Sequence, residues 1–259
     1  MPESRGEIRH DSKAAARIPG LVALQGAFGV EQRIVRLAPT PEFAARGATS
    51  IQGAGSHPGG TCQKYKCRTT DSNHSLPVAS NLLERRFTVN QPGAVWVSDI
   101  TSIPTDEGWL YLAGVKDLFS KQIVEFSMAA TMDKSLVLNA LKRAVSVHRT
   151  PAGMLLHSDR GSQYCSHRYR RLASFYGFRL SMSNKGDCYD NAPMESFWGI
   201  LKNELVHHKK YRTRVEAMAD ISEYIEIFYN RQRLQAGLDY LAPAEFGRLH
   251  HAKHCTNAA

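Results

Sequence analysis

Residues 95–130 read VWVSDITSIPTDEGWLYLAGVKDLFSKQIVEFSMAA and contain three segments with the hydrophobicity pattern of β-strands. Segment 95–103 alternates apolar and polar residues, and segments 109–119 and 121–130 follow after short connections. Connections of this length join antiparallel neighbours, because parallel strands need a longer crossover. We therefore expect a three-stranded antiparallel meander.

Helices and strands are predicted to alternate in the chain that follows this meander. Asp133 is a plausible N-cap for the first helix, since it directly precedes a segment with helical spacing. Helices are expected at 133–148, at 166–178, from 193 and at 212–233, with further strands at 153–159 and 179–183. This order predicts an α/β fold, in which a mixed five-stranded sheet has helices on both faces.

The chain has 259 residues, which we divide into four segments by composition and pattern. Residues 1–60 are weakly patterned, as in a loop or a disordered segment. We expect 61–93 to form an extended basic linker, 94–233 the folded core, and 234–259 a C-terminal tail. No run of 18 apolar residues and no apolar signal core is present, so we expect a cytoplasmic protein without a membrane span. The 5 cysteines fit no disulfide framework and are read as free thiols.

Three carboxylates are placed where this fold could bring them together. Asp99 lies within the first strand, Asp159 at the end of the fourth, and Glu195 in the first turn of the helix that starts near Pro193. Gathered carboxylates repel one another, so such a cluster implies cations, and oxygen ligands alone favour magnesium or manganese over zinc. Each residue also has a simpler interpretation, since Asp159 suits a turn and Glu195 suits the positive end of a helix.

The charge distribution indicates a polyanionic partner. The chain has a net charge of +9, and residues 160–215 hold 11 Lys and Arg against 4 Asp and Glu. A basic zone around the carboxylates suits nucleic acid, although a solubilising surface would look the same. Two metal ions about 4 Å apart would match this substrate, because they promote phosphoryl transfer. His157 could assist such a site, but we favour a core histidine.

Three motifs resemble the transposases of bacterial insertion sequences of the OrfB type: WVSDIT (96–101), HSDRGSQY (157–164) and CYDNAPMESFWGILKNEL (188–205). These are DDE enzymes, related in fold to retroviral integrase and ribonuclease H. Between Asp159 and Glu195 lie 35 residues, the spacing of the D,D(35)E signature of this group. The resemblance runs from about Tyr65 to the segment YLAPAEF at 240–246.

This resemblance implies a ribonuclease-H-like catalytic core and assigns roles to individual residues. Asp99, Asp159 and Glu195 would form the catalytic triad and hold Mg²⁺ or Mn²⁺, with two ions expected. The residues expected to contact DNA phosphates are Lys202, Lys185 and Arg160. Lys202 also lies about 20° from Glu195 around the helix axis. The implied reaction is metal-dependent strand cleavage, followed by strand transfer in which a DNA 3′-hydroxyl is the nucleophile.

The resemblance also implies partners. These are the terminal inverted repeats of the element, the target DNA, a helix-turn-helix protein from an upstream frame, and further copies of the chain assembled on DNA at the nucleoid. Residues 1–60 differ from the basic helix-turn-helix region that family members carry, and Gln235 stands where they tend to have His. Two alternatives remain. One is a catalytically decayed DNA-binding remnant or regulator of transposition, and the other is a ribonuclease acting on RNA–DNA hybrids.

Overall fold

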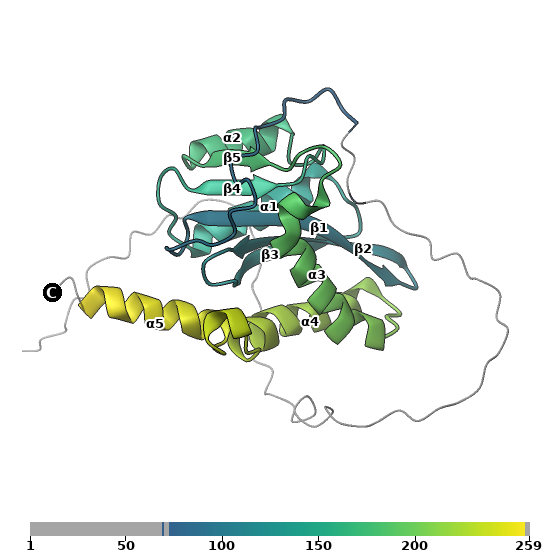
Figure 1. Ribbon diagram of the computed structural model, residues 1–259. Helices are drawn as coiled ribbons and strands as arrows, with labels where there is room; N and C mark the ends of the chain where they lie inside the picture. The colour runs from purple at the N-terminus through teal and green to yellow at the C-terminus, as the bar shows by residue number, and fades with distance from the viewer. Residues whose placement is uncertain (1–68, 70–72, 257–259) are drawn as a thin grey trace, which may run out of the picture. The chain divides into compact units, whose positions relative to one another are not determined.

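Five strands form one mixed sheet in the order β3-β2-β1-β4-β5 (Figure 1). The first three are antiparallel neighbours, as the short connections predict, and β4 and β5 join the other side of β1 in parallel. The strands are β1 (Val95–Thr105), β2 (Gly108–Asp117), β3 (Ile123–Ala129), β4 (Leu155–Ser158) and β5 (Arg179–Met182). The predicted α/β class and the five-stranded sheet are confirmed.

The structure, a computed structural model, describes residue 69 and residues 73–256. The weakly patterned segment 1–60 and most of the first part of the expected linker, 61–68 and 70–72, lie outside these residues. Within the described part of the chain, no helix is both long and apolar enough to cross a membrane.

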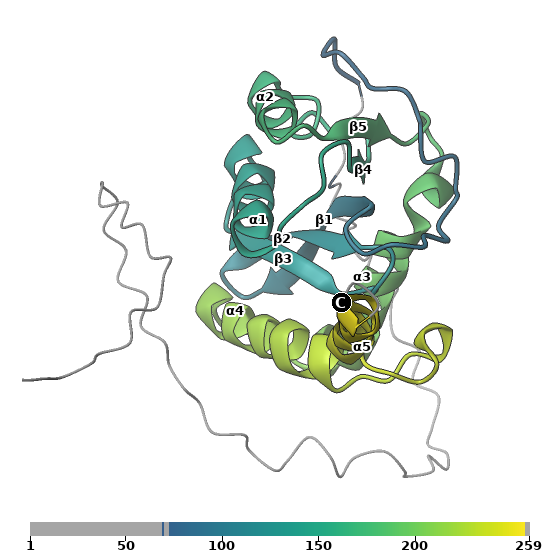
Figure 2. The same ribbon diagram turned by 90° about the vertical axis from the view of Figure 1, so that its left-hand side faces the viewer.

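Helices cover both faces of the sheet (Figure 2), and the alternation in β1 explains why. Trp96 points into a core shared with α1 (Lys134–Val147) and α2 (His167–Phe175). Its neighbour Val97 points into the opposite core, which is shared with α3 (Ala192–Glu204) and α4 (Arg214–Glu223). Since successive side chains of a strand face opposite sides, the central strand is buried on both faces.

Side-chain caps and one proline mark where the helices begin. The Asp133 side chain accepts a hydrogen bond from the backbone N–H of Ser135 and caps α1, as predicted. Ser166 caps α2 in the same way, by accepting from Tyr169 N. Pro193 lies in the first turn of α3, where its missing N–H costs nothing.

The C-terminal part differs from the expectation of one long helix over 212–233. Helix α4 ends at Glu223 and continues as a π-helical segment, Tyr224–Tyr229. A further helix, α5 (Pro243–Thr256), lies within the range expected to be a tail. It contacts the turn that follows β2, because the ring centroids of Phe119 and Phe246 lie 5.2 Å apart.

Candidate active site

The pairing of β1 with β4 brings Asp99 and Asp159 together. Ser98 is in register with Ser158, the last residue of β4, so the residue that follows each of these serines is one of the two carboxylates. Glu195 comes from the first turn of α3. All three line one cavity of about 350 Å³. The structure therefore gathers the three carboxylates that the sequence singled out.

Asp99 lies on the face of the sheet that α3 covers, and it is held by an indole. Trp198 Nε1 donates to Asp99 Oδ2 at 3.0 Å. Burial, and next the negative charge of Asp159, raise the pKa of Asp99, while the bond from Trp198 acts in the opposite direction. The indole thus stabilises the charged form of Asp99.

Gly114 makes room for this indole. It lies opposite Asp99 in the β1–β2 pair. A Cβ at this position would lie 2.9 Å from Cη2 of Trp198, closer than side-chain contacts allow. A glycine inside a strand commonly marks such a close approach.

Asp159 forms a turn and also lines the site, so the two interpretations of the sequence agree. Its Oδ1 accepts a hydrogen bond from Gly161 N at 2.8 Å. A Cβ on Gly161 would lie 3.0 Å from the same oxygen, which leaves little space for a larger residue. The turn fixes the carboxylate directly after β4.

Glu195 is exposed at the positive end of α3, where a carboxylate is favoured. Partial burial of its carboxylate raises its pKa. The start of this helix is anchored to β2, because Lys116 Nζ donates to the carbonyl oxygen of Pro193 at 3.0 Å. Burial lowers the pKa of Lys116 to about 7.

Two of the three expected DNA-contacting residues line the same cavity. Lys185 is exposed there, and Arg160 donates from Nε to the carbonyl oxygen of Ser183 at 2.5 Å. Lys202 lies on α3 seven residues after Glu195, partly exposed, and is not among the described residues that line the cavity.

His157 is a core histidine, as we favoured. It is fully buried, and its ring nitrogens lie 2.8 Å from Ser181 Oγ and 3.2 Å from Ser183 Oγ. Burial lowers its pKa to about 4, so the ring is neutral near pH 7.

Sequence reasoning missed three residues beside the triad. The hydrogen bond from Trp198 to Asp99 was not anticipated, and Gly114 was not considered. The third, Asn191, is buried, lines the cavity and donates from Nδ2 to Ser98 O at 3.2 Å. Gly114 gave the one signal available in the sequence, because a glycine within a strand indicates that another group approaches the backbone closely.

The donor set suits a hard divalent cation. Among the described residues, no three His, Cys, Asp or Glu side chains are close enough together to hold one ion as they stand. The negative charges of Asp159 and Glu195 nevertheless raise the pKa of Asp99, after burial as the main cause. A bound cation would offset this repulsion, and carboxylate oxygens are the ligands that Mg²⁺ and Mn²⁺ prefer.

Comparisons with known proteins give matches whose ranges include the candidate site. A sequence model of the integrase core domain matches residues 89–188, and a second model with that description matches 195–249. Together they include Asp99, Asp159 and Glu195.

Curated relatives are similar over most of the chain. An uncharacterized 31 kDa protein of insertion element IS600 from Shigella sonnei is 53% identical over 190 residues, which are 73% of this chain and 70% of that protein. The transposase for insertion sequence element IS904 from Lactococcus lactis is 44% identical over 183 residues, 71% of this chain and 72% of that protein.

A solved structure supports the fold. The intasome of simian T-cell lymphotropic virus, in complex with a PP2A regulatory subunit, contains a chain that matches with a TM-score of 0.53 at 16% identity. The match covers 70% of this chain and 62% of that one. The sheet with helices on both faces is thus the ribonuclease-H-like fold expected from the sequence.

Proposed function

Because the chain belongs to the integrase core domain family, among the transposases of insertion sequences, we propose that it cuts DNA at the ends of such an element and joins them to a target. The observation that carries this proposal is the meeting of Asp99, Asp159 and Glu195 at one cavity. An intact triad in this arrangement does not favour a decayed regulator, and the named relatives do not favour a ribonuclease.

The carboxylates have a shared task in this reaction. Asp99, Asp159 and Glu195 would hold two Mg²⁺ or Mn²⁺ ions, whose charge, when bound, stabilises the attacking and leaving oxygens of phosphoryl transfer. Trp198 orients the carboxylate of Asp99 through its hydrogen bond. Fixed orientation matters because small displacements of catalytic groups reduce the rate strongly.

The surrounding cations would hold the substrate. Arg160 and Lys185 line the cavity and would contact DNA phosphates there. Lys202 lies farther along α3 and would contact another phosphate of the DNA, outside the cavity. Such contacts position the DNA without reading its sequence.

The remaining partners follow from the same proposal. The substrates would be the terminal inverted repeats and target DNA. Several copies would assemble on the DNA, together with a helix-turn-helix protein of the same element. Residues 94–233 would form the catalytic core.

The test is cleavage of a duplex oligonucleotide that carries the end of the element, with Mg²⁺ or Mn²⁺. Asp99→Asn, Asp159→Asn and Glu195→Gln should each abolish cleavage while thermal unfolding remains cooperative. Asp106→Asn is a matched control, because this carboxylate is about half exposed and its ion pair with Lys210 is long, at 3.5 Å.

The outcomes separate the possible functions. Near wild-type cleavage by any one of the three variants would remove that residue from the site. Binding of the end by the wild type without any cleavage would favour a regulator, and preferential hydrolysis of an RNA–DNA hybrid would favour a ribonuclease.

A further inference from the structure

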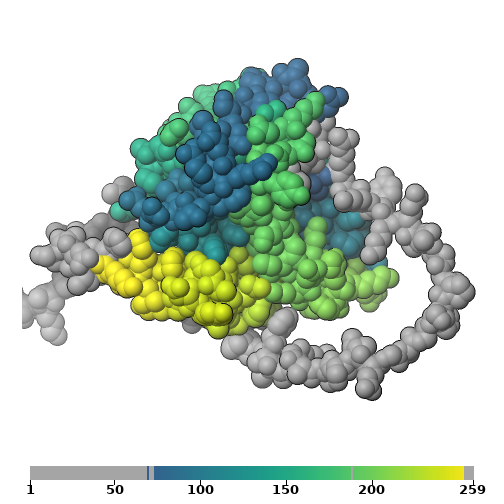
Figure 3. Space-filling model, viewed as in Figure 1, coloured from purple at the N-terminus to yellow at the C-terminus, as the bar shows by residue number. Residues whose placement is uncertain are grey.

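Residues 74–87, which we call the N-terminal strap, precede the sheet and lie against the residues that form the active site. Figure 3 shows dark blue residues of this part of the chain at the surface, beside green residues that lead into α3. At its start, His74 Nε2 donates to the carbonyl oxygen of Arg160 at 2.8 Å, one residue after Asp159. Near its end, Leu83 is buried in the core between the sheet, α3 and α4. The strap is thus attached at both ends.

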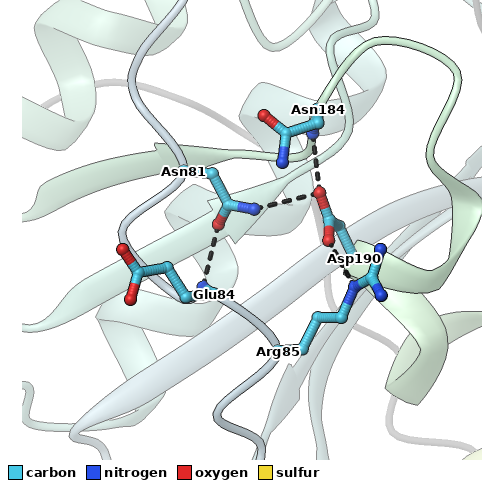
Figure 4. Close-up of a pocket in the computed structure, with 5 residues that line it drawn as sticks. All are labelled: Asn81, Glu84, Arg85, Asn184 and Asp190. Atoms are coloured by element: carbon cyan, nitrogen blue, oxygen red, sulfur yellow. Dashed lines mark hydrogen bonds and ion pairs between the residues drawn. The ribbon is translucent and has the colours of Figure 1, made fainter.

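A single buried carboxylate connects the strap to the loop that precedes α3, residues 183–191, which we call the active-site loop (Figure 4). Asp190 is only 2% exposed. It accepts hydrogen bonds from Asn81 Nδ2 at 2.9 Å and Arg85 Nε at 2.9 Å, both in the strap. It also accepts from the backbone N–H of Asn184 at 2.8 Å, which closes the loop on itself.

The active-site loop carries residues of the catalytic cavity. Lys185 and Asn191 line the cavity, and the chain continues from Asn191 directly into the helix that bears Glu195. A change in the conformation of this loop would therefore move both a candidate DNA contact and a candidate metal ligand.

Electrostatics make Arg85 the critical donor of the strap. Burial acts to raise the pKa of Asp190, but hydrogen bonds from Asn184 and Arg85 outweigh it and hold this pKa below its usual value. Arg85 also forms an ion pair with Asp187, and its guanidinium lies 5.8 Å from the ring centroid of Tyr189. Removing one partner of a buried charge is costly, because the other charge loses its compensation.

The backbone of the strap is strained where it presents Arg85. Glu84 and Arg85 have φ values of 48° and 57°, which is the left-handed region that residues with a Cβ rarely adopt. The Asn81 side chain stabilises this turn by accepting from Glu84 N at 3.0 Å. Figure 4 shows that the turn directs the Arg85 side chain toward Asp190. Such strain persists only where surrounding contacts maintain it.

We propose that the N-terminal strap is a positioning element of the active site. Through Arg85 and Asp190 it fixes the conformation of the active-site loop, and so the place of Lys185 and Glu195 at the cavity. The kinetic consequence rests on the proposed function, whereas the ordering of the loop does not. The integrase core match begins at residue 89, so the strap lies outside the matched domain.

The first test measures the loop directly, by hydrogen–deuterium exchange of the full-length chain. Arg85→Ala should increase exchange of the amides in 183–191 roughly tenfold or more, the effect of losing a hydrogen bond to a charged group. Arg86→Ala is the matched control, because it removes the same charge from the adjacent position. Its side chain is 73% exposed and pairs with Glu84 of the strap itself. This control should leave exchange in the loop unchanged.

The second test measures cleavage at saturating DNA and, separately, affinity for the element end. Arg85→Ala should lower the cleavage rate roughly tenfold relative to Arg86→Ala, with a smaller loss of affinity for DNA, because Lys185 is one of three candidate phosphate contacts. Arg85→Lys should give an intermediate rate, because it retains the charge but lacks the two separate nitrogens that donate to Asp190 and Asp187.

Either measurement can overturn the proposal. Unchanged exchange in Arg85→Ala shows that the strap does not hold the loop, and increased exchange with an unchanged cleavage rate shows that the loop does not position the site. If the wild type does not cut DNA, the proposed function fails, while the exchange experiment still decides whether the strap orders the loop.

Discussion

Trp198→Phe should weaken metal binding by a predictable amount. The substitution keeps an aromatic ring between α3 and the sheet but removes the Nε1–H that donates to Asp99 at 3.0 Å. A hydrogen bond to a charged group contributes roughly 1.5–3 kcal/mol, and about 1.4 kcal/mol corresponds to a factor of ten. The metal concentration that gives half-maximal cleavage should therefore rise roughly 10- to 100-fold, the range typical for partners of metal ligands.

The assay is the cleavage rate of an element end titrated with Mn²⁺ and with Mg²⁺ at fixed pH. Trp96→Phe is the matched control, since it makes the same change at a buried tryptophan in the core on the opposite face of the sheet. The control should reduce thermal stability without changing the metal requirement. Superimposable titrations of Trp198→Phe and wild type, or an equal shift in Trp96→Phe, would refute the reasoning.

Three further predictions concern the same site. Burial and the charge of Asp159 raise the pKa of Asp99 to about 8, against roughly 4 in an unfolded chain, so the folded protein binds the proton more tightly. Without added metal, this stabilisation is complete below about pH 4 and is lost as pH rises toward 8. The unfolding temperature should therefore fall as pH rises from about 4 to 8, and Asp99→Asn should reduce this dependence on pH. An unaltered dependence in that variant would contradict the prediction. Gly114→Ala should destabilise the protein by about 1–3 kcal/mol in urea unfolding, because the new Cβ would lie 2.9 Å from Trp198; unchanged stability would show that the indole is not confined. Lys202→Ala should weaken end binding measured in Ca²⁺ and lower its salt slope by up to about one, whereas identical salt curves would remove Lys202 from the DNA interface.

Local patterns in the sequence predicted where strands and helices lie better than which of them contact one another. Alternation in residues 95–103 identifies a strand, and capping chemistry identifies Asp133, because both depend on neighbours in sequence. The meeting of Asp99 and Asp159 depends on which strands pair, and alternation carries no information about that. The sequence predicted only that the two carboxylates would meet if their strands were neighbours, and β1 and β4 are neighbours.

The features that were missed depend on long-range packing. Trp198 lies three residues after Glu195 in the same motif, but its bond to Asp99 requires the space that Gly114 leaves in a different strand. The strap at 74–87 has little periodicity, since donors and acceptors distant in sequence set its conformation. A π-helical segment such as 224–229 differs from an α-helix in hydrogen bonding, and hydrophobic spacing does not distinguish the two over so short a length.

The contact between Trp198 and Asp99 also provides an optical probe within the protein. The chain contains 3 tryptophans, and this indole donates directly to a candidate metal ligand. Indole emission responds to nearby charge, so the fluorescence of this residue reports protonation or cation binding at Asp99. With Trp96 and Trp109 replaced by phenylalanine, the remaining signal would come from Trp198 alone. Cation arrival could then be followed in real time without a label, and separately from DNA cleavage.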